Sequence, residues 1–165
     1  VAFAANANAT YATQVLAEDE AYKTFEKMFP AADSRLLDSE DVFILASRSM
    51  VENYRGTLTN KSLGAGFLER TENGKQEVYF DGIKVIQRND WDRYIKTYQD
   101  NGTKWHLPHR AVMTVKANIP LGTLSVEDLT KLDAFYDRKD KTNIIDAVYT
   151  IESKHLESYM TVAAY

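Results

Sequence analysis

The chain has 165 residues, enough for one domain with a real core. It has no cysteine, which excludes thiolate zinc sites and thiol nucleophiles. Its 20 basic and 24 acidic residues are interleaved and give a net charge of -4. This pattern argues against nonspecific nucleic-acid binding, which needs Lys and Arg clustered on one face. No apolar run approaches the length of a membrane span.

The N-terminal stretch is rich in small residues. The chain begins with Val1 and continues as AFAANANAT, whose A-x-A spacings are typical of a signal-peptide cleavage site. No charged start and no long apolar stretch precedes these spacings. We therefore expect a fragment or a processed product.

The first half of the chain alternates helix and strand patterns. Apolar residues at helical spacing predict a long helix from Thr10 to Phe29, closed by Pro30. The continuous apolar run from Asp41 to Ala46 is typical of a central strand. Ser49 and Glu52 form the pattern of a capping box and predict that a short helix begins there. The polar, glycine-containing stretch 57–75 predicts an exposed loop or flap.

A hairpin and a helix follow. Asp81-Gly82 stands between two apolar stretches within 76–88, which is a strong hairpin signal because both central turn positions need positive φ. A helix is expected from Asp90. It carries one complete apolar face at i, i+3, i+4 and i+7, formed by Trp91, Tyr94, Ile95 and Tyr98.

The last third is predicted to be mainly strands. The stretch 110–116 alternates as a strand does, and NIPLGT is expected to be a turn. Ser125 is expected to cap a helix whose apolar face is formed by Val126, Leu129, Leu132, Phe135 and Tyr136. NIIDAVYTI and SYMTVAAY are β-rich and predict closing strands. These elements together predict an α+β fold with a mixed or antiparallel sheet flanked by helices.

The motifs for catalysis and metal binding are weak. His106 and His109 are three residues apart, but Pro108 lies between them, and a third ligand would have to be His155 or a distant carboxylate. No nucleotide-binding glycine pattern and no G-x-S-x-G elbow is present. We therefore predict no enzyme activity, no catalytic or metal site and no cofactor. A metal-dependent hydrolase that uses both histidines remains a rival hypothesis.

Aromatic residues point to an interaction protein. They form 12% of the chain, and ten of them are tyrosines. Tyrosine combines a large contact area with a polar tip, which suits surfaces that are buried against a partner. Interaction is therefore the leading class of function.

The order of the elements resembles the major capsid proteins of tailed bacteriophages. The landmarks are a helix ending at MFP, the strand and helix of DVFILASRSMVENYRGTL, the segment VYFDGIKVIQRNDW, the later LPHRAVMTVKANIPLGT, and the closing VYTIESKHLESYMTVAAY. In the third of these, Phe80, Gly82, Ile83, Val85 and Ile86 occupy the positions of the family's aromatic-x-G-hydrophobic pattern. The family's N-terminal arm and extended loop are not among the landmarks, so no cross-linking residue is carried over.

The resemblance implies a tailed-phage capsid-like fold with a long N-terminal spine helix. Residues 1–40 would be the spine-helix segment of a peripheral domain, and residues 41–165 an axial-type α+β domain with closing strands that return to the peripheral domain. The implied function is that of a structural shell protein, a major capsid subunit of a phage or prophage that assembles into hexamers and pentamers in the bacterial host cytoplasm. The implied partners are further copies of the chain, scaffold, portal and maturation protease.

Two loops are the expected inter-subunit contacts, 57–75 and 99–109. The candidate contact residues within them are Phe67, Arg70, Asn101, Trp105, His106 and His109. We interpret KWHLPH as a structural clamp in which Trp105 is buried and the histidines lie near an interface. The alternative function is a secreted or periplasmic ligand-binding domain, for which the N-terminal stretch and the tyrosines argue.

Overall fold

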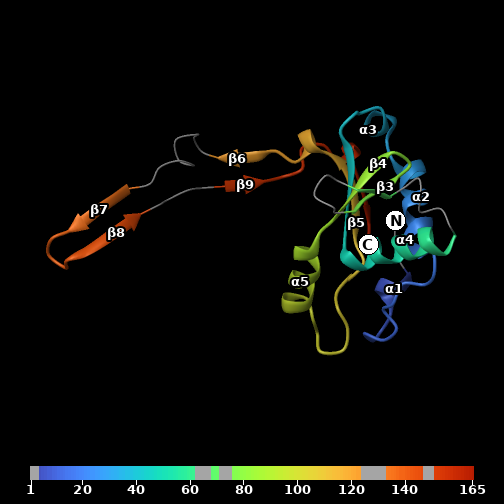
Figure 1. Cartoon of the computed structure of the whole chain (residues 1–165), viewed down its shortest axis with the longest axis horizontal. Coiled ribbons are helices and arrows are strands. Elements are labelled where there is room, and N and C mark those ends of the chain that lie inside the picture. Colours follow the sequence, from blue (N-terminus) through green and yellow to red (C-terminus); the bar gives the residue numbers. More distant parts are fainter. Residues whose placement is uncertain (1–3, 62–67, 71–75, 124–132, 147–150) are drawn as a thin grey trace. The chain divides into compact units, whose positions relative to one another are not determined.

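A computed structural model describes residues 4–61, 68–70, 76–123, 133–146 and 151–165 (Figure 1). The chain forms two compact units. Unit 1 comprises residues 1–116 and 157–165, and unit 2 comprises residues 117–156. The assignment of 1–40 and 41–165 to the two domains of a capsid subunit stays a prediction.

Unit 1 is built on a six-stranded mixed sheet in the order β10-β5-β1-β4-β3-β2. The strands are β1 (Val42–Ala46), β2 (Leu68–Arg70), β3 (Gln76–Phe80), β4 (Ile83–Gln87), β5 (Ala111–Val115) and β10 (Thr161–Ala164). β1 is parallel to β4 and antiparallel to β5, so it is central, as its apolar run predicted. The α+β class and the mixed sheet flanked by helices are confirmed.

The helices of unit 1 differ in length. They are α1 (Ala4–Ala7), α2 (Glu20–Ala31), α3 (Ser34–Leu37), α4 (Arg48–Asn60) and α5 (Asn89–Tyr98), with short 3-10 turns η1 (Lys116–Asn118), at the boundary between the units, and η3 (Ser158–Met160). α2 packs on α4, and both bury apolar side chains in the same core as the sheet.

The sheet contributes to the core a row of apolar side chains that crosses five strands. Pairing of neighbouring strands brings Val162, Met113, Ile44, Val85 and Val78 into line, and all five are buried. The alternate residues point to the other face of the sheet because side chains alternate along a strand. The register of β1 is thereby fixed: a slip of one residue would expose Ile44 and bury its neighbours.

The hairpin at Asp81-Gly82 is confirmed. It joins β3 and β4, and its two central residues have φ of 48° and 78°. Glycine at the second position adopts this conformation without the steric penalty that a Cβ would bring.

The long N-terminal spine helix is a wrong prediction. Only Glu20–Ala31 is helical in the predicted range 10–29, and none of the described residues forms a long spine helix. The reason lies far away in the sequence: the Gln14 side chain donates to the Trp105 carbonyl (2.8 Å) and accepts from the Trp105 amide (3.0 Å). Asp19, with φ of 62°, then turns the chain into the helix. Pro30 lies in the last turn, not after it.

The capping box at Ser49 is also wrong. Ser47 is the N-cap of α4, so Ser49 lies inside the first turn, where its hydroxyl faces His109. Glu52 pairs with Arg48 instead, at 2.6 Å. The first amide of the helix, that of Arg48, donates to the Asp92 carboxylate (2.9 Å). The Asp92 side chain, from α5, therefore caps a backbone amide at the start of α4, which the local motif was expected to do.

Unit 2 contains two short antiparallel ladders. β6 (Leu121–Thr123) pairs with β9 (Ile151–Ser153), and β7 (Asp133–Asp137) pairs with β8 (Thr142–Asp146). The two stretches predicted as closing strands each contain a strand: NIIDAVYTI contains most of β8, and SYMTVAAY contains β10 of unit 1 after the turn η3. LGT forms a strand where a turn was expected. The helix predicted after Ser125 falls mainly on 124–132, outside the described residues, but Phe135 and Tyr136 lie on β7, so they form no helical face. Pairing of Phe135 and Tyr136 with β8 favours the extended conformation over the helical one.

Candidate interaction surface

Helix α5 places aromatic side chains in solvent. Of the four residues predicted to form one apolar face, only Ile95 is buried, whereas Tyr94 is 54% exposed and Tyr98 is 74% exposed. The helix follows β4 directly, and an Arg88–Asp90 ion pair (2.6 Å) spans its first turn. Asp90 and Asp92 in the first turn and Lys96 in the last turn match the helix dipole. The helix is therefore fixed at its start while its tyrosines remain uncovered.

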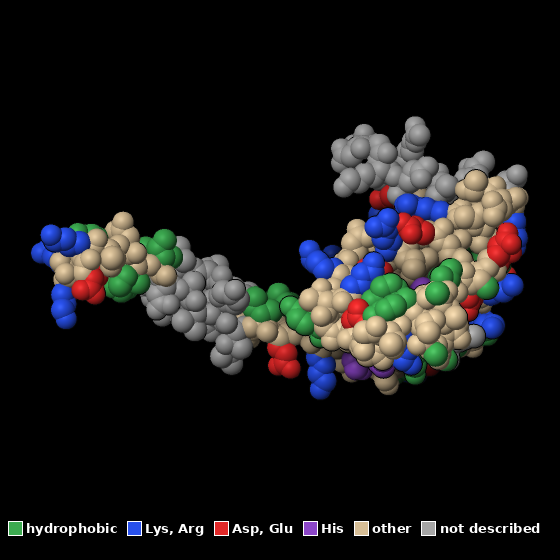
Figure 2. Space-filling model, turned by 90° about the horizontal axis from the view of Figure 1, so that it is seen from below, with side chains coloured by type: hydrophobic (Ala, Val, Ile, Leu, Met, Phe, Trp, Pro, Cys, Tyr) green, Lys and Arg blue, Asp and Glu red, His purple; other side chains and the backbone are tan. Residues whose placement is uncertain are grey.

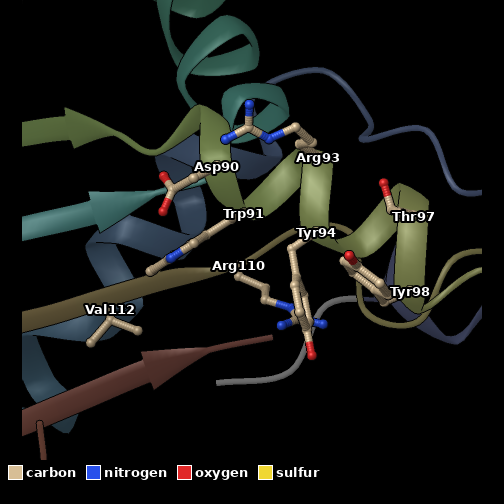
Figure 3. Close-up of a pocket in the computed structure, with 8 residues that line it drawn as sticks. All are labelled: Asp90, Trp91, Arg93, Tyr94, Thr97, Tyr98, Arg110 and Val112. Atoms are coloured by element: carbon tan, nitrogen blue, oxygen red, sulfur yellow. The ribbon is translucent and has the colours of Figure 1, made fainter. Parts of the chain in front are cut away.

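A groove of about 670 Å³ lies between α5 and β5 (Figure 3). We call it the α5 groove, and its lining residues are Asp90, Trp91, Arg93, Tyr94, Thr97, Tyr98, Arg110 and Val112. Figure 3 shows Trp91 and Tyr94 projecting from α5 toward the side of the groove that Arg110 and Val112 form. The rings of Tyr94 and Tyr98 are 5.1 Å apart and tilted by 43°. Exposed Tyr, Trp and Arg side chains are the types that dominate the energy of protein interfaces.

Arg110 is held by neutral oxygens. Its Nε donates to the Leu107 carbonyl (2.7 Å), and its Nη2 donates to the His106 carbonyl (2.9 Å) and to the Gln99 side chain. Partial burial lowers the pKa of its guanidinium, and the nearby Tyr94 opposes that shift. No carboxylate pairs with Arg110 among the residues that the structure describes. The cation is thus held by hydrogen bonds and partly desolvated, and no carboxylate of the described residues is paired with it.

The segment KWHLPH is tied to the N-terminal part of the chain. Trp105 was expected to be buried, but it is only half-buried. Its ring lies 4.6 Å from the ring of Tyr11 and 5.5 Å from Lys96 Nζ. Gln14 holds its backbone from both sides. Tyr11 also hydrogen-bonds Asp100 through its hydroxyl, which holds the pKa of that carboxyl below its usual range. These contacts explain how the loop is clamped.

His109 is the buried centre of this clamp. Its Nε2 lies 2.7 Å from the Gln14 carbonyl and its Nδ1 2.7 Å from Ser49 Oγ. Its own amide and carbonyl bond to the side chain of Asn6, at 3.0 and 2.7 Å. A carbonyl only accepts, so Nε2 carries the proton and Nδ1 accepts from the serine hydroxyl. Burial lowers the pKa of His109, which agrees with this neutral tautomer.

The other predicted contact residues lie at different places. His106 and Asn101 are exposed. The Asn101 Oδ1 accepts from the amides of Thr103 and Lys104, so this side chain shapes the loop. Arg70 ends edge strand β2, and Phe67 lies outside the described residues. The role of these residues in contacts between subunits stays a prediction.

The described residues contain no group of three His, Asp or Glu side chains placed to hold a metal ion. In the same part of the chain, no helix is both long enough and apolar enough to cross a membrane. On the face that Figure 2 shows, cationic and anionic side chains of unit 1 lie among one another. Two features of unit 1 bear on its function, the aromatic α5 groove and the buried clamp around His109, whose neighbour Arg110 lines the groove.

Comparison with known proteins gives a likeness of fold. No protein-family model matches the chain, and no curated protein matches it. A solved structure described by its source, Mycobacterium phage Che8, matches 99% of this chain with a TM-score of 0.56 at 10% sequence identity. The two chains share a fold. This chain spans about half of the other, 52% of its length. The likeness links the fold to a phage protein and shows nothing about activity.

Sequence reasoning missed Arg110 and Gln14 as parts of the site. Arg110 precedes a buried strand, where a charged residue is normally assigned to the surface. Gln14 falls in a stretch whose apolar spacing predicted helix. No local signal marks either residue, since their partners lie elsewhere in the chain.

Proposed function

We propose that this chain is part of a structural shell protein, a major capsid subunit of a phage or prophage head. The observation that carries the proposal is the fold likeness over 99% of the chain to a phage chain. The order of sequence landmarks, which resembles that of tailed-phage capsid proteins, supports it independently. The function so proposed is mechanical: copies tile into hexamers and pentamers, and stability comes from modest contacts multiplied by symmetry.

The surface chemistry of unit 1 is compatible with such a role. A shell subunit needs uncovered contact surfaces on a rigid body, and the α5 groove has exposed tyrosines beside a fixed arginine. Unit 2 has further uncovered apolar side chains, including Phe135, Tyr136 and Ile145, with exposed fractions of 56%, 55% and 70%. Two-stranded ladders are marginally stable alone in water, so contacts with other chains would stabilise them.

The proposal includes partners and place. The subunit binds other copies of itself, and scaffold, portal and maturation protease act on it during assembly in the bacterial cytoplasm. The mature location is the virion. In this function the chain performs no catalysis and needs no cofactor, and it makes no specific contact with nucleic acid.

Electron microscopy of the full-length gene product tests the proposal, with any neighbouring scaffold and protease genes expressed beside it. We expect shells, tubes or isolated rings of six subunits. A uniform monomer at every protein concentration would contradict the proposal. It would favour a secreted or periplasmic ligand-binding domain, for which the open, aromatic α5 groove would be the place to look for a ligand.

A further inference from the structure

The α5 groove has positive charge that no carboxylate of the described residues neutralises. Asp90 is the groove's acidic residue, and it is already paired with Arg88. Arg93 is exposed and has no ion pair within the described part of the chain, and Arg110 contacts neutral oxygens. Arg110 already donates through Nε and Nη2, so a carboxylate would reach it through Nη1. The opposite charge of a carboxylate would stabilise a guanidinium that is partly desolvated beside aromatic rings.

A loop elsewhere in unit 1 has the opposite character. What we call the acidic loop is residues 37–41, with the sequence LDSED: Leu37 ends α3, and residues 38–41 join it to β1. Its three carboxylates, on Asp38, Glu40 and Asp41, are exposed, and none forms an ion pair among the described residues. Leu37 beside them is 40% exposed. The loop therefore combines an uncovered apolar side chain with unpaired negative charge.

The groove and the acidic loop lie at opposite ends of the central strand. The loop precedes Val42, the first residue of β1, whereas the last residue, Ala46, pairs with Ala111, next to Arg110. Five strand residues separate the two ends, a length of about 17 Å. Figure 1 likewise shows α3 and α5 toward opposite ends of the sheet. The two surfaces are thus held apart within one copy.

We propose that the acidic loop of one copy docks in the α5 groove of the next copy, with its carboxylates on Arg110 and Arg93 and Leu37 against Tyr94 and Tyr98. This inference rests on the proposed function and adds the contact that joins neighbouring subunits. A second copy is the occupant that the charges favour, because each copy then supplies one loop and one groove. Different surfaces that meet in this way make a heterologous, head-to-tail contact, which closes into a ring when the rotation permits.

Disulfide trapping tests this contact, since the chain has no cysteine of its own. Chains with Thr97→Cys, at a lining residue of the groove, and tagged chains with Asp38→Cys are mixed, assembled and mildly oxidised. Both positions are exposed, so the folded state should tolerate the changes. In the matched control, the tagged chain keeps Asp38 and carries Thr59→Cys instead, at an exposed position on α4. We expect at least tenfold more cross-linked heterodimer from the Thr97 and Asp38 pair than from the control pair.

Three outcomes separate the two proposals. Rings or shells without cross-linking above the control would overturn the loop-groove contact and leave the shell function standing. Cross-linking of Thr97→Cys chains mainly to each other would show a symmetric contact between two grooves. That outcome would also overturn the head-to-tail contact. Failure of the full-length protein to associate at all would overturn both.

A charge reversal provides a second test that needs no cross-link. The triple variant Asp38→Lys, Glu40→Lys, Asp41→Lys places positive charge opposite Arg110, which should reduce the yield of assembled rings at least tenfold. Far-UV circular dichroism should be unchanged, because these side chains form no ion pair in the described fold. Assembly of this folded variant at the parent yield would contradict the contact.

Discussion

His109 and Ser49 are joined by a 2.7 Å hydrogen bond across 60 residues of sequence. The bond links the start of β5 to the first turn of α4, and the second ring nitrogen of His109 extends the link to Gln14 in the N-terminal segment. One buried side chain therefore connects three parts of unit 1. The loop that forms one end of the α5 groove depends on this connection, because Arg110 follows His109 directly.

Replacement of His109 should be costly. His109→Ala leaves the Gln14 carbonyl without this donor and the Ser49 hydroxyl without this acceptor, and each buried polar group so affected costs about 1–3 kcal/mol. We expect the free energy of unfolding to fall by at least about 2 kcal/mol, measured by urea denaturation. The control is His106→Ala, because His106 is exposed and its described bonds use backbone atoms. Equal effects of the two variants would contradict the role of His109 as a tie.

Stability should fall on acidification below pH 6.5. Burial lowers the pKa of His109 in the folded protein, while the Gln14 carbonyl, Glu20 and Asp92 oppose the shift. Above the unfolded value of 6.5 the ring is neutral in both states, so stability is fully present. Below it the unfolded chain binds a proton that the folded chain resists, and the free energy of unfolding decreases by at most about 1.4 kcal/mol per pH unit.

Urea midpoints at pH 7.5 and pH 5.5 measure this effect. Between these values the carboxylates that are paired in the folded state stay ionised: Arg35 holds the pKa of Asp33 at about 2, and Lys61 holds that of Asp19 below its usual range. The control is a His109→Gln variant, whose loss of stability between the two pH values should be smaller than that of the parent. An equal loss in both proteins would show that the pH dependence arises from other groups.

The parts of the fold that sequence predicted correctly are those with local causes. β1 was recognised because its apolar run has strand length, and the β3-β4 hairpin because Asp81-Gly82 meets a backbone requirement of the turn. The start of α2 was wrong because Gln14 bonds to a residue 91 positions away, which overrides the local helical spacing. Phe135 and Tyr136 were assigned to a helix because a short apolar run fits both periods.

The α5 groove was only partly predictable. The spacing of Tyr94, Ile95 and Tyr98 correctly indicated a helix with an aromatic face. Spacing does not reveal whether a neighbour covers that face: Ile95 is buried and Trp91 half-buried, whereas Tyr94 and Tyr98 are exposed. Arg110 entered the site through contacts with Leu107 and Gln99, which depend on the path of the intervening loop. Tertiary structure was needed to bring these groups together.

Two glycines should respond oppositely to alanine. Gly82 has φ of +78° in the hairpin turn, where a Cβ is strained, so Gly82→Ala should lower the free energy of unfolding by about 1–2 kcal/mol. Gly56 lies within α4 and has open space where a Cβ would be, so Gly56→Ala should raise it by about 0.5–1 kcal/mol. Thermal or urea unfolding of both variants measures the signs. Destabilisation by Gly56→Ala would show that this face of α4 is covered.

Phe25 should be among the most sensitive positions in the core. It is fully buried on α2, and its ring packs edge-on against Tyr54 and Phe80, each 5.4 Å away. Phe25→Ala removes a large apolar surface and leaves a cavity that this aromatic cluster cannot fill, so we expect a loss of about 3–5 kcal/mol. Tryptophan fluorescence during urea unfolding measures it, since Trp91 and Trp105, the protein's two tryptophans, both lie in unit 1.

The matched control for Phe25 is Tyr98→Ala in the α5 groove. Tyr98 is 74% exposed, so its removal should change the free energy of unfolding by no more than about 0.5 kcal/mol. If Tyr98 serves assembly, the same variant should reduce ring formation while unit 1 unfolds as in the parent. A large loss of stability in Tyr98→Ala would mean that this side chain supports the fold of the subunit, and the groove would then not be a free contact surface.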